Sequence, residues 1–218
     1  MRLTVEKLIE ESQKFTKHER KITHPKLLGI SDGKAIGTYI ERRFKIYLKN
    51  KYKFNLGSSA KGIDFPDAHI NTDLKVTSIK RPQSSSPFKS IEQKIYGLGH
   101  NLLLFVYKKR DIGNNCYLEF KHCIFIPSEK TGDYTITKKL RQIIEKGGSE
   151  REIINLLNDK NIPGDREVLE NLSKKILANP PKQGYLTISN ALQWRLKYSN
   201  AINLKDEINE SYKYEKIQ

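Results

Sequence analysis

Apolar residues recur with helical spacing in two stretches near the start of the chain. Between Thr4 and Arg20, apolar positions stand among charged ones, and Thr4 occupies the place of a helix N-cap. A stronger apolar stripe runs from Gly33 to Lys51, directly after Asp32, a second capping residue. The pattern predicts two helices, the second with one face suited to packing against a sheet.

The pattern changes to the two-residue alternation of β-strands after residue 62. Two alternating runs, 62–65 and 70–77, flank a cluster of turn-forming residues and predict a β-hairpin. In the second run Asp73 and Lys75 share a face, because side chains of a strand alternate. With a turn centred on Asp67 and Ala68, we expect Asp64 to face Asn71 and to lie diagonal to Asp73.

Three further segments complete the first half of the chain. Residues 90–99 predict a short helix that ends at glycine, and 101–107 form a continuous apolar run typical of a strand buried on both faces. Residues 117–126 alternate and place His122 on the apolar side, where we interpret it as a core histidine. The strand's expected inward residues are Leu118, Phe120, His122, Ile124 and Ile126. The order of elements predicts an α/β core.

The second half has a different composition of elements. Three helical segments, 137–146, 149–158 and 165–178, are separated by glycine and proline, and Ser149 with Glu152 forms a capping-box pattern. A short strand at 183–188 and a helix at 189–200 follow. We therefore expect two domains, a core over residues 1–130 and a mainly helical accessory region over residues 131–218 whose layout loosely resembles a helix-turn-helix.

The charge of the chain points to a polyanionic partner. Its 218 residues contain 40 Lys and Arg against 25 Asp and Glu, a formal charge of +15, and the basic residues are spread along the sequence. No apolar run is long enough to span a membrane and no signal peptide is apparent, so we expect a cytoplasmic protein with no membrane partner. Cys116 and Cys123 have no other metal-ligand residues at the spacing of a zinc site, so we interpret them as reduced structural thiols.

The predicted hairpin carries the most specific candidate chemistry. Two carboxylates a few ångströms apart repel each other unless a hard cation lies between them, and oxygen ligands suit Mg²⁺. A lysine beside such a cation is placed to orient a water for attack on a phosphodiester. The plainer alternative is an exposed hairpin whose polar face is simply solvated.

The spacing of Gly62-x-Asp64 and Asp73-Leu74-Lys75 resembles the signature of the PD-(D/E)xK nucleases, which many type II restriction endonucleases carry. The resemblance covers residues 33–126 and implies a mixed β-sheet flanked by helices, with Asp64 and Asp73 as Mg²⁺ ligands and Lys75 as the water-orienting group. The run from Gly37 to Glu41 resembles the helix that sends a glutamate to the metal in this superfamily. The alternative for Glu41 is an ion pair with Lys45 on a solvated face.

Two segments outside the hairpin have the composition of DNA-contacting elements. Residues 79–88 are polar, long for a passive connector and follow the strand of Asp73, while the predicted helix 189–200 carries side chains that bond base edges. Alternatively, the first is a plain surface loop and the second docks on the core. The candidate DNA-binding residues are Lys61, Lys80, Arg81, Gln83, Ser84, Ser85, Ser86, Asn190, Gln193, Arg195 and Lys197.

These features together predict a type II restriction endonuclease that hydrolyses specific sequences in double-stranded DNA with Mg²⁺. Cutting both strands implies a homodimer, and a restriction enzyme implies a companion DNA methyltransferase in the host. Two alternatives remain open at this level. One is a structure-specific nuclease such as a junction resolvase or repair nuclease, and the other is a non-catalytic DNA-binding regulator.

Overall fold

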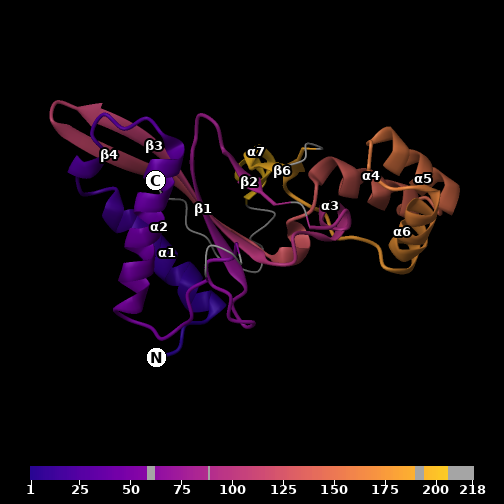
Figure 1. Ribbon diagram of the computed structural model, residues 1–218, viewed down its shortest axis with the longest axis horizontal. Helices are drawn as coiled ribbons and strands as arrows, with labels where there is room; N and C mark the ends of the chain where they lie inside the picture. Colours follow the sequence, from indigo (N-terminus) through magenta and orange to yellow (C-terminus); the bar gives the residue numbers. More distant parts are fainter. Residues whose placement is uncertain (58–61, 88, 190–193, 206–218) are drawn as a thin grey trace. The chain divides into compact units, whose positions relative to one another are not determined.

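The computed structural model describes residues 1–57, 62–87, 89–189 and 194–205 (Figure 1). Its contacts divide the chain into two compact units that interleave along the sequence. Unit 1 comprises Met1–Gln83, His100–Ile126 and Lys205–Gln218, and unit 2 comprises Ser84–Gly99 and Pro127–Leu204. No helix in the described part of the chain is long and apolar enough to cross a membrane.

Unit 1 begins with the two predicted helices, α1 (Val5–Glu19) and α2 (Gly33–Lys49), separated by a 3-10 turn at Pro25–Leu27. Both predicted caps are confirmed. The Thr4 hydroxyl accepts a hydrogen bond from the amide of Lys7, and the Asp32 carboxylate accepts from the first amides of α2. These bonds satisfy amide groups that a helix leaves without partners at its start.

The sheet of unit 1 is mixed, as predicted. Strand β1 (Thr72–Ser78) runs parallel to β3 (Asn101–Ile112), which pairs antiparallel with β4 (Asn115–Ile126) in a long hairpin (Figure 1). Aromatic rings from the helices pack on the sheet, with the Phe44 ring centroid 5.0 Å from that of Phe15 and 5.2 Å from that of Phe105. The unit therefore has one core between α1, α2 and one face of the sheet.

The predicted register of the first hairpin is wrong. Only an isolated bridge joins its two arms, between Phe65 and Thr72, so the pairing is displaced by two residues and Asp64 comes opposite Asp73 instead of Asn71. The cause lies in the turn. The amides of Ile70 and Asn71 both donate to the Asp67 carbonyl, and Asn71 adopts a φ of 38°, which lengthens the reversal beyond a tight turn.

The predicted alternation of the strand at 117–126 is also wrong in its second half. Phe120 pairs with Tyr107 while His122 pairs with Val106, so Lys121 is the extra residue of a β-bulge. One inserted residue exchanges the two faces of a strand. Phe120 consequently packs into the unit 1 core, whereas the half-buried His122 lies on the other face.

Unit 2 contains α3 (Gln93–Tyr96) and a 3-10 turn (Ser128–Lys130), followed by the three predicted helices. These are α4 (Tyr134–Glu145), α5 (Glu150–Asp159) and α6 (Arg166–Ala178), packed around a shared apolar cluster. The capping box of Ser149 and Glu152 is confirmed, with each side chain bonded to the other's backbone amide.

A second sheet in the order β2-β6-β5 corrects two predictions. Strand β2 (Gln83–Ser86) lies within the segment predicted as a loop, and β5 (Thr187–Ile188) pairs antiparallel with β6 (Trp194–Lys197), where a helix was predicted. The only helix found in the described part of that region is the short α7 (Ser199–Asn203). Residues 194–197 alternate between buried and exposed, which is the period of a strand.

A buried carboxylate joins α1 to α2 and gives unit 1 a pH-dependent contribution to stability. The Glu11 carboxylate is 3% exposed and accepts hydrogen bonds from the Tyr47 hydroxyl at 2.5 Å and the Lys51 ammonium at 2.6 Å. Burial acts to raise the pKa of Glu11, but these bonds and the charge of Lys51 outweigh it and lower the pKa to about 2. The ionised form is therefore favoured by folding.

We expect Glu11→Gln to destabilise the protein by about 2 kcal/mol at pH 7, because the substitution removes charge-assisted hydrogen bonds. The pKa is lower in the folded state, so the stabilisation is present above the unfolded value of 4.5 and disappears as the pH falls toward about 2. Urea unfolding at pH 7 and pH 3 checks this, with Glu167→Gln, at an exposed glutamate of α6, as control. A difference between Glu11→Gln and wild type of the same size at both pH values would contradict it.

Candidate functional site

The candidate site of unit 1 forms where α2 crosses β1. Gly37 lies at this crossing, where a Cβ would make ordinary van der Waals contact, 3.5 Å from the Val76 carbonyl oxygen on β1. Glu41 and Lys45 lie one and two turns further along the same helix face. Both interact with the Asp64 carboxylate, Glu41 through its charge and Lys45 through an ion pair.

The carboxyl groups of Asp64 and Asp73 lie close enough to shift each other's pKa. Asp64 also accepts a hydrogen bond from the amide of Leu74 at 2.9 Å, which ties the segment before the turn to β1. The Lys75 ammonium lies 2.7 Å from the Asp73 carboxylate. The structure thus brings together the two acids and the lysine that the sequence pattern singled out.

The two carboxylates have opposite pKa shifts. Burial and the neighbouring charge of Asp64 raise the pKa of Asp73 to about 7, although Lys75 opposes the rise. Burial also acts to raise the pKa of Asp64, but the hydrogen bond and charge of Lys45 outweigh it, so the net shift is downward. The pair therefore favours one shared proton, or another positive charge, between its oxygens.

Lys45 is the residue of the site that sequence reasoning missed. Its ammonium forms an ion pair with the Asp64 carboxylate, whereas the sequence offered it only as a surface partner of Glu41. A signal was present in the spacing, since Gly37, Glu41 and Lys45 fall at intervals of four on one helix face. Its partner could not be known without the packing of α2 on β1.

Glu41 is half-buried beside this cluster but is not hydrogen-bonded within it in any described contact. Burial and the charge of Asp64 raise its pKa, while Lys75 and Lys45 act in the other direction. Within the described ranges, no group of three or more His, Cys, Asp or Glu side chains has the arrangement of a metal site. The carboxylates that could together bind a metal ion are thus those of Asp64 and Asp73.

The chemistry of that pair fits a hard divalent cation. All of its donor atoms are carboxylate oxygens, the ligands that Mg²⁺ prefers, and no sulfur or imidazole lies among them. Burial is the main cause of the raised pKa of Asp73, and the charge of Asp64 adds to it even with Lys75 alongside. A cation bound to both carboxylates would offset their mutual repulsion.

Asp67, the other acid before the Asp73-Leu74-Lys75 triplet, is engaged elsewhere. Its carboxylate accepts hydrogen bonds from the side-chain amide of Asn55 at 2.6 Å and from the backbone amide of Asn55 at 3.1 Å. These bonds lower its pKa and hold a loop in place. Among the described contacts, none joins Asp67 to Asp73 or Lys75.

The candidate DNA-binding residues are distributed over both units. Lys80 and Arg81 are exposed after β1, and the run Gln83–Ser86 forms β2 with Ser85 exposed. Arg195 and Lys197 are exposed on β6. The remaining candidates, Lys61, Asn190 and Gln193, lie outside the described residues.

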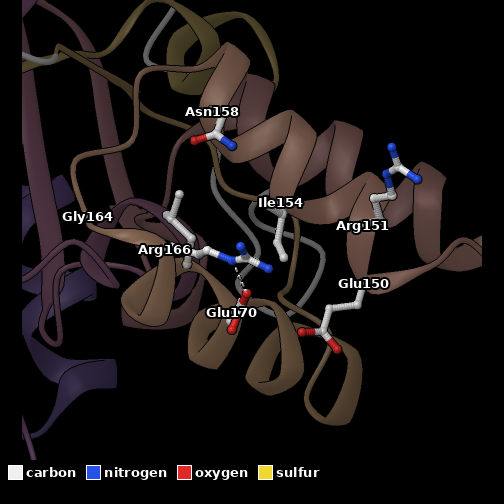
Figure 2. A pocket seen from close by; sticks show the side chains of 8 residues that line it. Glu150, Arg151, Ile154, Asn158, Gly164, Arg166 and Glu170 are labelled. Atoms are coloured by element: carbon white, nitrogen blue, oxygen red, sulfur yellow. Dashed lines mark hydrogen bonds and ion pairs between the residues drawn. The ribbon is translucent and has the colours of Figure 1, made fainter.

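Unit 2 also contains a hollow between α5 and α6 (Figure 2). Its wall carries both signs of charge, and Arg166 pairs with Glu170 at 2.7 Å across one turn of α6. An i,i+4 pair on an exposed helix is an ordinary surface feature. The hollow therefore shows none of the convergent acids seen in unit 1.

The chain is similar to known proteins over nearly its whole length. A family described as "Type II restriction enzyme NspV" matches residues 2–212. The type II restriction enzyme NspV of Nostoc sp. (strain ATCC 29411 / PCC 7524) is 48% identical over 202 residues, which cover 92% of this chain and 91% of that protein. No solved structure matches the chain. The extent and the level of identity assign this chain to the NspV family of type II restriction enzymes.

Proposed function

We propose that this protein is a Mg²⁺-dependent type II restriction endonuclease that hydrolyses phosphodiester bonds at a specific sequence in double-stranded DNA, with a catalytic centre of the PD-(D/E)xK type. The observation that carries the proposal is the convergence of Asp64, Asp73 and Lys75 at the junction of β1 and α2. Membership of the NspV family supports the substrate and the reaction.

Each residue of the cluster has a proposed role. Asp64 and Asp73 would hold Mg²⁺, with Glu41 as a further contact from α2. The cation supplies compensation for the negative charge that develops at phosphorus and at the leaving oxygen. Lys75, already beside Asp73, donates a hydrogen bond that orients the attacking water, and Lys45 holds the Asp64 carboxylate in its ionised form.

The surroundings of the catalytic centre follow from the same proposal. The formal charge of +15 favours binding of a polyanion, and the exposed basic and polar side chains of both units supply contacts to phosphates and bases. Cutting both strands of a duplex implies a homodimer, in which each subunit acts on one strand. A companion DNA methyltransferase would protect host DNA, and both proteins would act in the cytoplasm.

Cleavage of phage DNA by the purified protein tests the function. We expect discrete fragments in Mg²⁺ and none in EDTA, because sequence recognition restricts cutting to defined sites. The products are separated by electrophoresis and the ends are sequenced. A continuous smear would point to a nuclease without sequence recognition, and intact DNA at every divalent ion tested would overturn the proposal.

Lys75→Ala is expected to lower the cleavage rate about a thousandfold or more, because it removes an interaction needed in the transition state. Duplex binding measured by fluorescence anisotropy should change little, since Lys75 is not proposed to anchor a phosphate. Lys26→Ala, at an exposed lysine of the 3-10 turn in unit 1, is the matched control and should cut at the wild-type rate. Wild-type cutting by Lys75→Ala would remove Lys75 from the catalytic centre.

The two acids before the triplet should respond differently to the same change. Asp64→Asn should abolish detectable Mg²⁺-dependent cleavage and weaken Mg²⁺ binding measured by calorimetry, since it removes a charged ligand from the carboxylate pair. Asp67→Asn keeps one of the two oxygens that accept from Asn55 and should lower cleavage by at most a few-fold. If Mg²⁺ binding depended on Asp67 and not on Asp64, the assignment of Asp64 would be wrong.

A further inference from the structure

The small sheet of unit 2 has two chemically different faces. Along β6, Trp194 and Leu196 are buried while Arg195 and Lys197 are exposed. Successive side chains of a strand point to opposite faces, so both cations project from the same side of the sheet. Because β6 is the middle strand, that side is bordered by β2 and β5.

The neighbouring strands, β5 and β2, also place polar side chains on one face of the sheet and buried side chains on the other. On β5, the exposed Thr187 pairs with Lys197, and the buried Ile188 pairs with Leu196. Paired residues of adjacent strands share a face. On β2, the hydroxyl of Ser84 lies 2.5 Å from that of the fully buried Tyr198, and the next residue, Ser85, is exposed on the opposite side. The polar sheet face therefore consists of Ser85, Thr187, Arg195 and Lys197.

The apolar side of the sheet is held firmly in unit 2. The Trp194 ring lies 5.3 Å from the ammonium of Lys94, a lysine that is only 1% exposed. Asp133 caps α4 with one carboxylate oxygen and accepts from the amide of Ile188 at 2.8 Å with the other. The polar sheet face is thus presented by a strand pair whose reverse side is fixed by packing and hydrogen bonds.

The charge of this face defines its partner. None of the residues in β2, β5 or β6 is acidic, and neither Arg195 nor Lys197 forms an ion pair with a described residue. Two exposed cations flanked by hydroxyl groups offer fixed positive charge together with hydrogen-bond donors and acceptors. A polyanion with polar groups between its charges, such as a nucleic acid duplex, complements such a surface.

We propose that the polar sheet face lies in the major groove of the bound duplex, so that this protein reads its sequence with β-strands and not with a terminal recognition helix. The groove is roughly 12 Å wide and admits a β-ribbon, while adjacent strands lie only about 4.8 Å apart. Arg195 has the planar fork that bonds guanine in two places, and Lys197 has the point charge suited to a phosphate. This inference rests on the proposed function, which supplies duplex DNA as the substrate.

The two cations have separable expected effects. In a Lys75→Ala background with Mg²⁺, anisotropy compares a duplex taken from a mapped cut site with a scrambled duplex of equal length. Arg195→Ala should reduce the preference for the cut-site duplex by about 5- to 100-fold, and Arg195→Lys should not restore it, because lysine lacks the two-point bond. Lys197→Ala should weaken the binding of both duplexes equally. It should also reduce the magnitude of the slope of log affinity against log salt concentration by about one.

Lys174→Ala on α6 is the matched control, an exposed cation of the same unit, and should leave both quantities unchanged. Retained preference in Arg195→Ala together with a wild-type salt slope in Lys197→Ala would overturn the inference while discrete cleavage by wild type still supported the proposed function. If wild type made no discrete cuts, the variants would be compared on a random-sequence duplex in EDTA. There, a lower slope for Lys197→Ala supports the polar sheet face as a duplex-binding surface, and an unchanged slope overturns it.

Discussion

The repulsion between Asp64 and Asp73 is the constraint on which the rest of the site depends. The carboxyl groups of the buried Asp73 and the half-buried Asp64 lie close enough to shift each other's pKa, and each pairs with its own lysine. One lysine comes from the same strand as Asp73 and the other from α2. The contact of α2 with β1 at Gly37 lies two helical turns from Lys45, which pairs with Asp64.

Local signals in the sequence were sufficient for much of the fold. Helix caps at Thr4 and Asp32, the capping box at Ser149 and the long apolar run of β3 each follow from a few neighbouring residues. The convergence of Asp64 with Asp73 was also predictable, even though the predicted register was wrong. A displacement of two residues preserves which face each side chain occupies, so an error of that size leaves the chemistry of the face intact.

Two other kinds of error changed the predicted fold more: a strand register displaced by one residue, and a strand predicted as a helix. The bulge at Lys121 exchanges the two faces of β4 in its second half. The alternation of residues 117–126 gives no sign of the position of the bulge. The run from Trp194 to Lys197 is too short to distinguish a helix from a strand by its spacing, and its pairing with β5 decides the matter. Lys45 was missed for a related reason, since its partner is distant in sequence.

The interleaving of the two units constrains how the molecule can be divided or assembled. The chain leaves unit 1 after Gln83, returns at His100, leaves again after Ile126 and returns at Lys205. A fragment ending near residue 130 would keep Ser84–Gly99, including α3, but lose the helices that cover it. During synthesis, β2 likewise emerges before its partner β6, which follows after about a hundred further residues, roughly 5 to 20 s of translation. Gene fusion or domain exchange within this family is therefore better attempted with the whole chain than with either unit.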